Sequence, residues 1–178
     1  DMKSGVINLD FASVGATENL MMAGALLDGE TVIVNAAREP EIVDLAEFIN
    51  AMGGDVRGAG GSVISIRGVK KLHGCAYTPM PDRICAGTVL AAVNATGGSV
   101  TVKNVMPDHI FGITERLKKA GARLSVRGNA VRITADARPR PIHKLETNFY
   151  PAFPTDMQPQ FCAMLARASG SSVIVENL

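Results

Sequence analysis

The sequence contains no tryptophan, and aromatic residues make up only 4% of it. Its hydrophobic residues, 47% of the total, must therefore build an aliphatic core, and 178 residues are enough for one ordinary domain or two small lobes. An excess of charge of one sign is also lacking, because 18 Lys and Arg balance 17 Asp and Glu. No basic run indicates nucleic acid and no basic amphipathic helix indicates a membrane surface. We therefore expect neither as a partner.

Long apolar runs and paired cysteines are missing as well. The longest apolar stretch, residues 20–27, is far too short to cross a bilayer, and no signal peptide is visible. Cys75, Cys85 and Cys162 are odd in number and lack CxxC spacing, and the three histidines lie on separate predicted elements. These features predict reduced thiols in a cytoplasmic protein and no metal site.

What the sequence does contain is an internal repeat. Three segments, residues 32–35, 100–104 and 173–177, each read as a strand that closes on an asparagine, and they recur at intervals of about 70 residues. A short glycine-containing turn precedes each strand, and an apolar helix precedes each turn. We expect these helices at residues 18–27, 84–93 and 161–166. Because they have no polar face, we expect them to be buried on all sides.

A residue suited to a helix N-cap stands at the same distance before each of these asparagines. The three residues are Ser13, Asp82 and Thr155, and we expect each to cap the helix that follows it. Ser13 also follows a strand expected at residues 6–10. The turn over residues 13–17 therefore joins a strand to a helix and leaves backbone N–H groups unpaired, which makes it a natural seat for phosphate or carboxylate.

The first two copies of the repeat continue alike. Pro40 and Pro107 open amphipathic helices, and each helix is followed by two hairpin strands, at residues 55–59 with 62–67 and at residues 123–127 with 130–134. Each unit should therefore be βαβαββ, with sheets outside and helices within. Copy one spans about residues 5–68 and copy two about residues 74–135, beginning with a strand headed by Cys75. Copy three begins near Ile142 and breaks off after one helix and one strand, which predicts that the chain is a piece of a longer protein.

Five segments of the chain, in this order, resemble the motifs of a known family. They are residues 13–19, 35–44, 72–74, 81–84 and 153–158. Together they closely resemble the UDP-N-acetylglucosamine 1-carboxyvinyltransferases, the enolpyruvyl transferases of peptidoglycan synthesis, over nearly the whole chain. The resemblance implies an α/β fold of two lobes, each built from three βαβαββ units, an inside-out α/β barrel that is incomplete here. It assigns residues 1–79 to a unit of the first lobe, residues 80–138 to a unit of the second, and residues 139–178 to the start of the next.

The resemblance also implies an activity and a set of site residues. The reaction transfers the enolpyruvyl group of phosphoenolpyruvate to the 3-hydroxyl of UDP-N-acetylglucosamine, the first committed step of peptidoglycan synthesis in the cytoplasm. It needs no cofactor, and the partner implied besides the two substrates is the remainder of the parent chain. The residues implied to bind the UDP-sugar are Ser13, Val14 and Gly15 at its diphosphate, Leu178 near its uracil, Thr155 beside the reacting centre, and Asp156 at the sugar hydroxyl as the candidate catalytic base.

Three points leave alternatives open. The reactive cysteine loop of the family, which precedes the serine motif, and the arginines that grip phosphoenolpyruvate have no counterpart here, so we expect the chain alone to be inactive. Phe11 stands where some members carry a basic residue. On the residues alone Asp156 fits a helix N-cap as well as a base. The alternatives are a shikimate-pathway enolpyruvyl synthase of the same fold and a non-catalytic binding module.

Overall fold

The computed structural model describes residues 3–136 and 138–177 of the chain, which form two compact units, Asp1–Met80 and Pro81–Leu178. Each unit has its own cluster of buried hydrophobic side chains.

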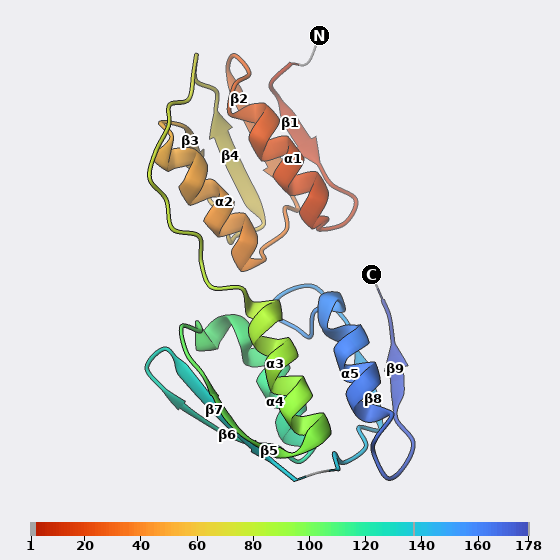
Figure 1. Ribbon diagram of the computed structural model, residues 1–178. Helices are drawn as coiled ribbons and strands as arrows, with labels where there is room; N and C mark the ends of the chain where they lie inside the picture. The colour runs from red at the N-terminus through yellow and green to blue at the C-terminus, as the bar shows by residue number, and fades with distance from the viewer. Residues whose placement is uncertain (1–2, 137, 178) are drawn as a thin grey trace. The chain divides into compact units, whose positions relative to one another are not determined.

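The first unit is a four-stranded sheet with two helices on one face (Figure 1). The strand order is β1-β2-β4-β3, with β1 parallel to β2 and the other pairs antiparallel. Side chains alternate between the core and solvent along the central strands, so that Ile33, Ile64 and Ile66 are fully buried under the helices. The elements, in chain order, are β1 (Val6–Asn8), α1 (Val14–Gly24), β2 (Glu30–Val34), α2 (Pro40–Ala51), β3 (Asp55–Arg57) and β4 (Val63–Arg67).

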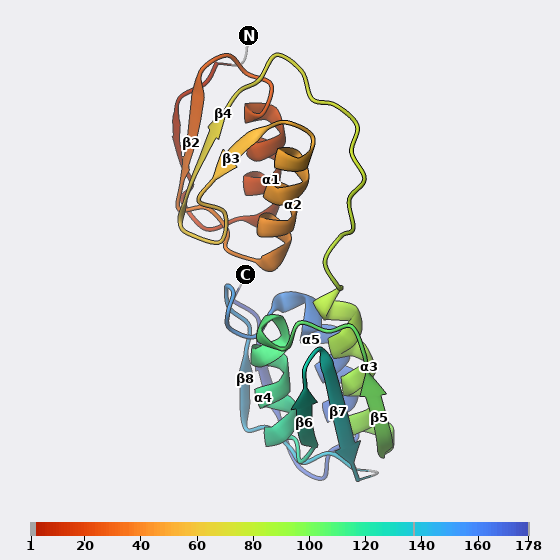
Figure 2. The ribbon, with the colours of Figure 1, turned by 90° about the vertical axis from the view of Figure 1, so that its left-hand side faces the viewer.

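The second unit places its helices between two sheets (Figures 1 and 2). One sheet is antiparallel with the order β5-β7-β6, and the other is the parallel pair β8-β9. The elements are α3 (Arg83–Thr96), β5 (Gly98–Val102), η1 (Pro107–Ile110), α4 (Phe111–Lys119), β6 (Arg123–Arg127), β7 (Ala130–Ala135), β8 (Lys144–Glu146), η2 (Thr155–Met157), α5 (Gln158–Leu165) and β9 (Val173–Val175). Leu90 of α3 and Phe161 of α5 are fully buried at the centre.

The repeat predicted from the sequence is confirmed in its helices, its hairpins and the strands that close on asparagine. The prolines open α2 and η1, and both hairpins form with the expected strands. Asn35 and Asn104, which close the first two repeated strands, both adopt the left-handed backbone conformation, with φ of 60° and 55°. Asparagine tolerates this conformation better than most residues, which explains why it recurs.

Two expectations about the repeat are wrong. The apolar helices are not buried on all sides, since Met22 of α1 is 50% exposed, Val89 of α3 is 40% exposed, and Cys162 of α5 is also exposed. Each helix packs against its own sheet or neighbouring helices and leaves another face uncovered by the described residues. In addition, α1 begins at Val14, four residues earlier than expected.

The strand expected to start at Cys75 is also absent, because residues 68–82 contain neither helix nor strand. This segment is held by α2 and its C-terminal turn instead. The His73 N–H donates to the Met52 carbonyl oxygen at 2.9 Å, and the Met80 N–H donates to Asp44 Oδ1 at 3.0 Å. In the first copy of the repeat, the first strand pairs with β2. In the second copy, the hydrogen bonds to Asp44 and Met52 take the place of such a pairing with β5.

Candidate functional site

The turn at Ser13 has the geometry expected of a helix N-terminus. Ser13 is the N-cap of α1, and its Oγ accepts from the Ala16 N–H at 3.3 Å. The N–H groups of Val14 and Gly15, which lie in the first turn of the helix, have no acceptor among the described residues. They are therefore available to an anion, and the positive end of the helix dipole favours one.

Thr17 fixes this turn to the rest of the unit. Its hydroxyl donates to the Ser13 carbonyl oxygen at 2.8 Å and accepts from the Ala37 N–H at 3.0 Å, and the residue is fully buried. Ala37 lies in the loop after β2, so one side chain ties the start of α1 to a segment 20 residues further along. The sequence placed Thr17 in the turn but gave no sign of this link, because the partner is distant in the chain.

Gly15 lies on an exposed part of the same turn, and a Cβ atom built on it meets no atom within 4 Å. A methyl group added there would stand in open space rather than in the protein. One turn further along α1, partial burial and the nearby carboxylates Glu41 and Glu39 raise the pKa of Glu18 above its usual range. The unit therefore has negative charge close to the helix.

Thr155 does not cap a helix, so the expectation for this residue is wrong. It is the first residue of η2, whose N-cap is Pro154, and the Thr155 hydroxyl donates to Glu176 Oε2 at 2.8 Å. Glu176 follows β9, where its Oε1 accepts from the Thr147 hydroxyl at 2.7 Å. The hydroxyl that would have capped the helix is used instead to anchor η2 to the end of the parallel strand pair.

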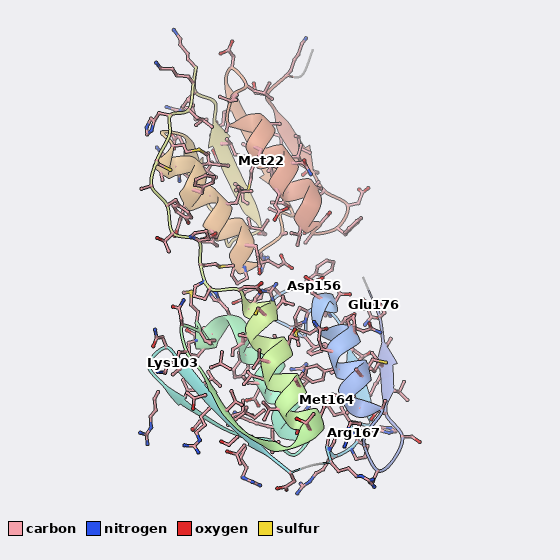
Figure 3. All side chains as sticks on the ribbon, in the orientation of Figure 1. Met22, Lys103, Asp156, Met164, Arg167 and Glu176 are labelled. Atoms are coloured by element: carbon pink, nitrogen blue, oxygen red, sulfur yellow. The ribbon has the colours of Figure 1, made fainter. Side chains whose placement is uncertain are left out.

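The bond from Thr155 to Glu176 holds η2 and leaves the Asp156 side chain without an internal partner among the described residues. Asp156, labelled in Figure 3, is exposed in η2, and its carboxylate makes no hydrogen bond or ion pair with any described residue. Its neighbour Met157 is fully buried in the core and holds the turn against it. The carboxylate thus faces solvent, while the residues on either side of it, Thr155 and Met157, are fixed by a hydrogen bond and by burial. Glu176 and Thr147, which anchor η2 through Thr155, were not singled out from the sequence, since only the fold brings them together.

The predicted site residues are divided between the two units. Leu178 lies outside the described residues. Ser13, Val14 and Gly15 belong to the first unit, and Thr155 and Asp156 to the second. Within the described part of the chain, no three His, Cys, Asp or Glu side chains gather as they would around a metal ion, and no helix is long and apolar enough to cross a membrane.

Comparison with known proteins assigns the fold and the motifs to one family. The sequence profile of EPSP synthase (3-phosphoshikimate 1-carboxyvinyltransferase) matches residues 2–178, which is nearly the whole chain. The chain belongs to the EPSP synthase family. The repeated apolar helices, the turn at Ser13 and the η2 turn that Thr155 anchors all lie within the matched residues.

The similar curated relatives of this EPSP synthase family chain carry a second name. The chain is 54% identical over 173 residues to the UDP-N-acetylglucosamine 1-carboxyvinyltransferase of Thermotoga maritima, and 48% identical over 177 residues to that of Geobacter metallireducens. These matches cover 97% and 99% of this chain but only 41% and 42% of the relatives. The chain thus spans about two fifths of the length of the relatives that it matches.

Solved structures of the EPSP synthase family share the fold. The enolpyruvyl transferase NikO from Streptomyces tendae superposes with a TM-score of 0.77 at 22% identity, over 96% of this chain and 43% of that one. An EPSP synthase from Acinetobacter baumannii gives a TM-score of 0.55 at 24% identity, over 98% of this chain and 41% of the other. The expected α/β fold of repeated units, of the enolpyruvyl transferase type, is confirmed.

Proposed function

We propose that the protein to which this chain belongs transfers the enolpyruvyl group of phosphoenolpyruvate to the 3-hydroxyl of UDP-N-acetylglucosamine. The observation that carries the proposal is the 54% identity, over 97% of the chain, to a relative with that transferase name. The reaction would serve peptidoglycan synthesis in the cytoplasm, and with it cell shape and division. In this proposal residues 1–79 form a unit of one lobe, residues 80–138 a unit of the other, and residues 139–178 begin the next.

The turn at Ser13 is proposed to hold the diphosphate of the UDP-sugar. The free N–H groups of Val14 and Gly15 point out of a helix N-terminus, and phosphate oxygens are the acceptors that such a site favours. Gly15 supports this role because its surface is open, so a phosphate can approach the backbone closely. The nearby acidic residues Glu18, Glu39 and Glu41 limit the affinity, because their charge has the same sign as the ligand.

Asp156 is proposed to accept a hydrogen bond from the sugar 3-hydroxyl and to act as the base in the reaction. The carboxylate is exposed and has no partner among the described residues, so it can accept from a ligand without breaking an internal bond. Thr155 is proposed to lie beside the reacting centre. Because its hydroxyl is engaged by Glu176, its part would be to position η2 rather than to contact the substrate by that group.

The profile name raises a second candidate, the transfer of an enolpyruvyl group to a phosphorylated shikimate. The identities favour the UDP-sugar, since the relatives with that name are 46–54% identical, against 24% for the solved EPSP synthase. For the chain alone we propose binding without turnover, because none of its three cysteines lies upstream of Ser13.

The test of the proposed diphosphate seat is calorimetric titration of the chain with UDP-N-acetylglucosamine and, separately, with 3-phosphoshikimate. We expect heat from the UDP-sugar only. Gly15→Ala should weaken the binding by about tenfold or more, because the added methyl group occupies the approach to the N–H groups. The fold should be retained, since that methyl group meets no protein atom.

The control for this substitution is Gly74→Ala. Gly74 is exposed, its Cβ would also meet nothing within 4 Å, and its backbone is not left-handed. It should bind the UDP-sugar as the unchanged chain does. Absence of heat with millimolar UDP-N-acetylglucosamine would overturn the proposal, as would equal binding by both glycine variants.

A separate test addresses Asp156 by comparing UDP-N-acetylglucosamine with UDP. Asp156→Asn keeps the size of the side chain but replaces one carboxylate oxygen by an amide group. It should weaken binding of the sugar nucleotide by about tenfold and leave UDP unaffected, because UDP lacks the sugar hydroxyl. An equal loss for both ligands would exclude the assigned contact.

A further inference from the structure

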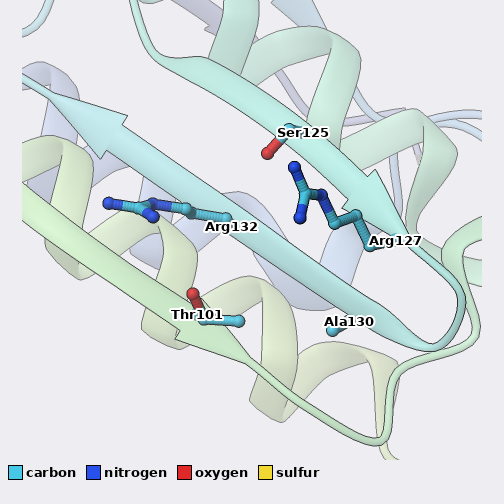
Figure 4. Close-up of a pocket in the computed structure, with 5 residues that line it drawn as sticks. All are labelled: Thr101, Ser125, Arg127, Ala130 and Arg132. Carbon is cyan, nitrogen blue, oxygen red and sulfur yellow. The ribbon is translucent and has the colours of Figure 1, made fainter.

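The exposed face of the β5-β7-β6 sheet carries a hollow lined by polar side chains. Its volume is about 280 Å³, and its lining residues are Thr101, Ser125, Arg127, Ala130 and Arg132 (Figure 4). The strand register alone places them together. Arg132 pairs directly with Thr101 on one side and with Ser125 on the other, and Arg127 pairs with Ala130. Side chains two residues apart on a strand share a face, so all five lie on the same face of the sheet.

The charge of this face differs from that of the corresponding face in the first unit. The sheet β1-β2-β4-β3 carries Glu30, Asp55, Arg57 and Arg67, two acids and two bases, and Arg57 Nε lies 2.8 Å from Asp55 Oδ1. The strands β5, β6 and β7 carry three arginines and no acid. Two copies of one repeat therefore present a neutral face in one unit and a cationic face in the other. The fold alone does not require the positive charge.

Within the described part of the chain, neither Arg127 nor Arg132 forms an ion pair. Arg132 Nε donates to Ser99 Oγ at 3.2 Å, and Ser99 Oγ lies 3.0 Å from Thr134 Oγ1. This contact holds the guanidinium along the sheet and leaves its terminal nitrogens to donate elsewhere. The third arginine of the face, Arg123, lies 3.6 Å from the exposed Asp136 and so is partly neutralised.

These groups fit a compact anion with two or more negative charges. Guanidinium groups bind phosphate oxygens through paired, charge-assisted hydrogen bonds. The Thr101 and Ser125 hydroxyls, which flank Arg132 on the two neighbouring strands, add neutral donors. Ala130 has no long side chain to fill the hollow. A nucleic acid fits less well, because such surfaces use aromatic stacking and a track of many cations. The three strands contain no aromatic residue.

We propose that this hollow is a binding site for a small anion bearing two phosphate groups, of the size of diphosphate. Arg127 and Arg132 each bind one phosphate group, and the Thr101 and Ser125 hydroxyls donate to further phosphate oxygens. The site is independent of the turn at Ser13, since every residue that forms it belongs to the second unit.

The experiment is an NMR titration of the isotope-labelled chain with inorganic diphosphate, with inorganic phosphate and citrate as separate arms. We expect saturable shifts of amide signals in β5, β6 and β7, and weaker binding of the single phosphate. Arg127→Gln and Arg132→Gln should each weaken the binding of diphosphate measured at these signals by about tenfold, because each removes a charge-assisted contact. Both side chains are exposed, so the fold should tolerate the change.

Matched controls come from the other repeat. Arg57→Gln and Arg67→Gln remove the same charge from the corresponding sheet face, and neither should change the affinity measured at β5–β7. Gly15→Ala, which tests the turn at Ser13, should leave these shifts intact. Shifts confined to residues 13–17 would overturn the proposal. So would equal weakening by all four arginine variants, or citrate binding as tightly as diphosphate.

Discussion

At the scale of single residues, the asparagines that close the repeated strands show how a sequence pattern acquires a physical cause. Asn35 has a φ of 60°, and its Nδ2 donates to the Leu9 carbonyl oxygen at 3.0 Å. Asn177 makes the equivalent bond, from its Nδ2 to the Thr147 carbonyl oxygen at 3.1 Å. In both places the amide joins two parallel strands just beyond their last ladder pair.

We therefore expect Asn35→Ala to destabilise the first unit by about 1–2 kcal/mol, since alanine is strained in the left-handed conformation and loses the side-chain bond. The measurement is amide hydrogen exchange of β2. Asn35→Gly serves as the control, because glycine loses the bond but adopts this φ without strain, and it should cost less. A glycine variant no more stable than the alanine variant would show that the backbone conformation is not the cause.

At the scale of elements, residues 68–82 are the part of the chain where the repeat fails. The sequence predicted a strand here, yet the segment lies along α2. The Tyr77 hydroxyl donates to the carbonyl oxygen of Asp44 at 3.0 Å and to the Oδ1 of Asp44 at 2.9 Å. The centroid of the Tyr77 ring lies 5.1 Å from that of the Phe48 ring. Contacts between side chains outweigh the pattern of the repeat, and periodicity alone could not show them.

This contact makes the stability of the first unit depend on alkaline pH. Burial, the hydrogen bond to Asp44 and the charges of Asp44 and Glu47 raise the pKa of Tyr77 from 10.0 to about 12. The folded state then holds the phenolic proton more tightly than the unfolded state. The stabilisation is complete below pH 10 and is lost as the pH rises toward 12.

The pH dependence is measured by titrating the tyrosinate absorbance together with urea unfolding. Tyr77→Phe should remove the later absorbance step and flatten the loss of stability across this pH range. Tyr150→Phe, which removes the other tyrosine, should leave both unchanged. If the Tyr77→Phe variant lost stability with pH as steeply as the unchanged chain, the Tyr77 hydroxyl would not be the titrating group.

At the scale of the whole molecule, the described part of the chain exposes several large apolar side chains. Met22 and Leu26 are four residues apart, at the end of α1 and just beyond it, and are 50% and 56% exposed. Phe11, before the turn at Ser13, is 62% exposed. Exposed apolar side chains of this size favour association.

We expect the isolated chain to self-associate reversibly as its concentration rises, measured by sedimentation velocity. The double substitution of Met22→Gln and Leu26→Gln should shift the association to higher protein concentration, because it removes apolar area from water-exposed contacts. Lys119→Gln, at an exposed polar position of α4, is the control and should have no such effect. A monomer at all concentrations would contradict the expectation.

The sequence by itself determined what depends on near neighbours in the chain. The cap at Ser13, the cap at Asp82 and the hairpins all follow from residues a few positions apart, and all appear in the structure. The order of the motifs also indicated the family, because five short patterns in one order rarely coincide by chance.

Only the tertiary structure decided what depends on partners far apart in the chain. The Thr155 hydroxyl, which was expected to cap a helix, donates to Glu176 instead. Asp44 accepts from the Met80 N–H and so holds the segment of residues 68–82, where a strand was expected. The pairing of β5, β6 and β7 gathers Arg127 and Arg132 on one face. Such contacts result from packing and strand register, which local residue preferences do not contain.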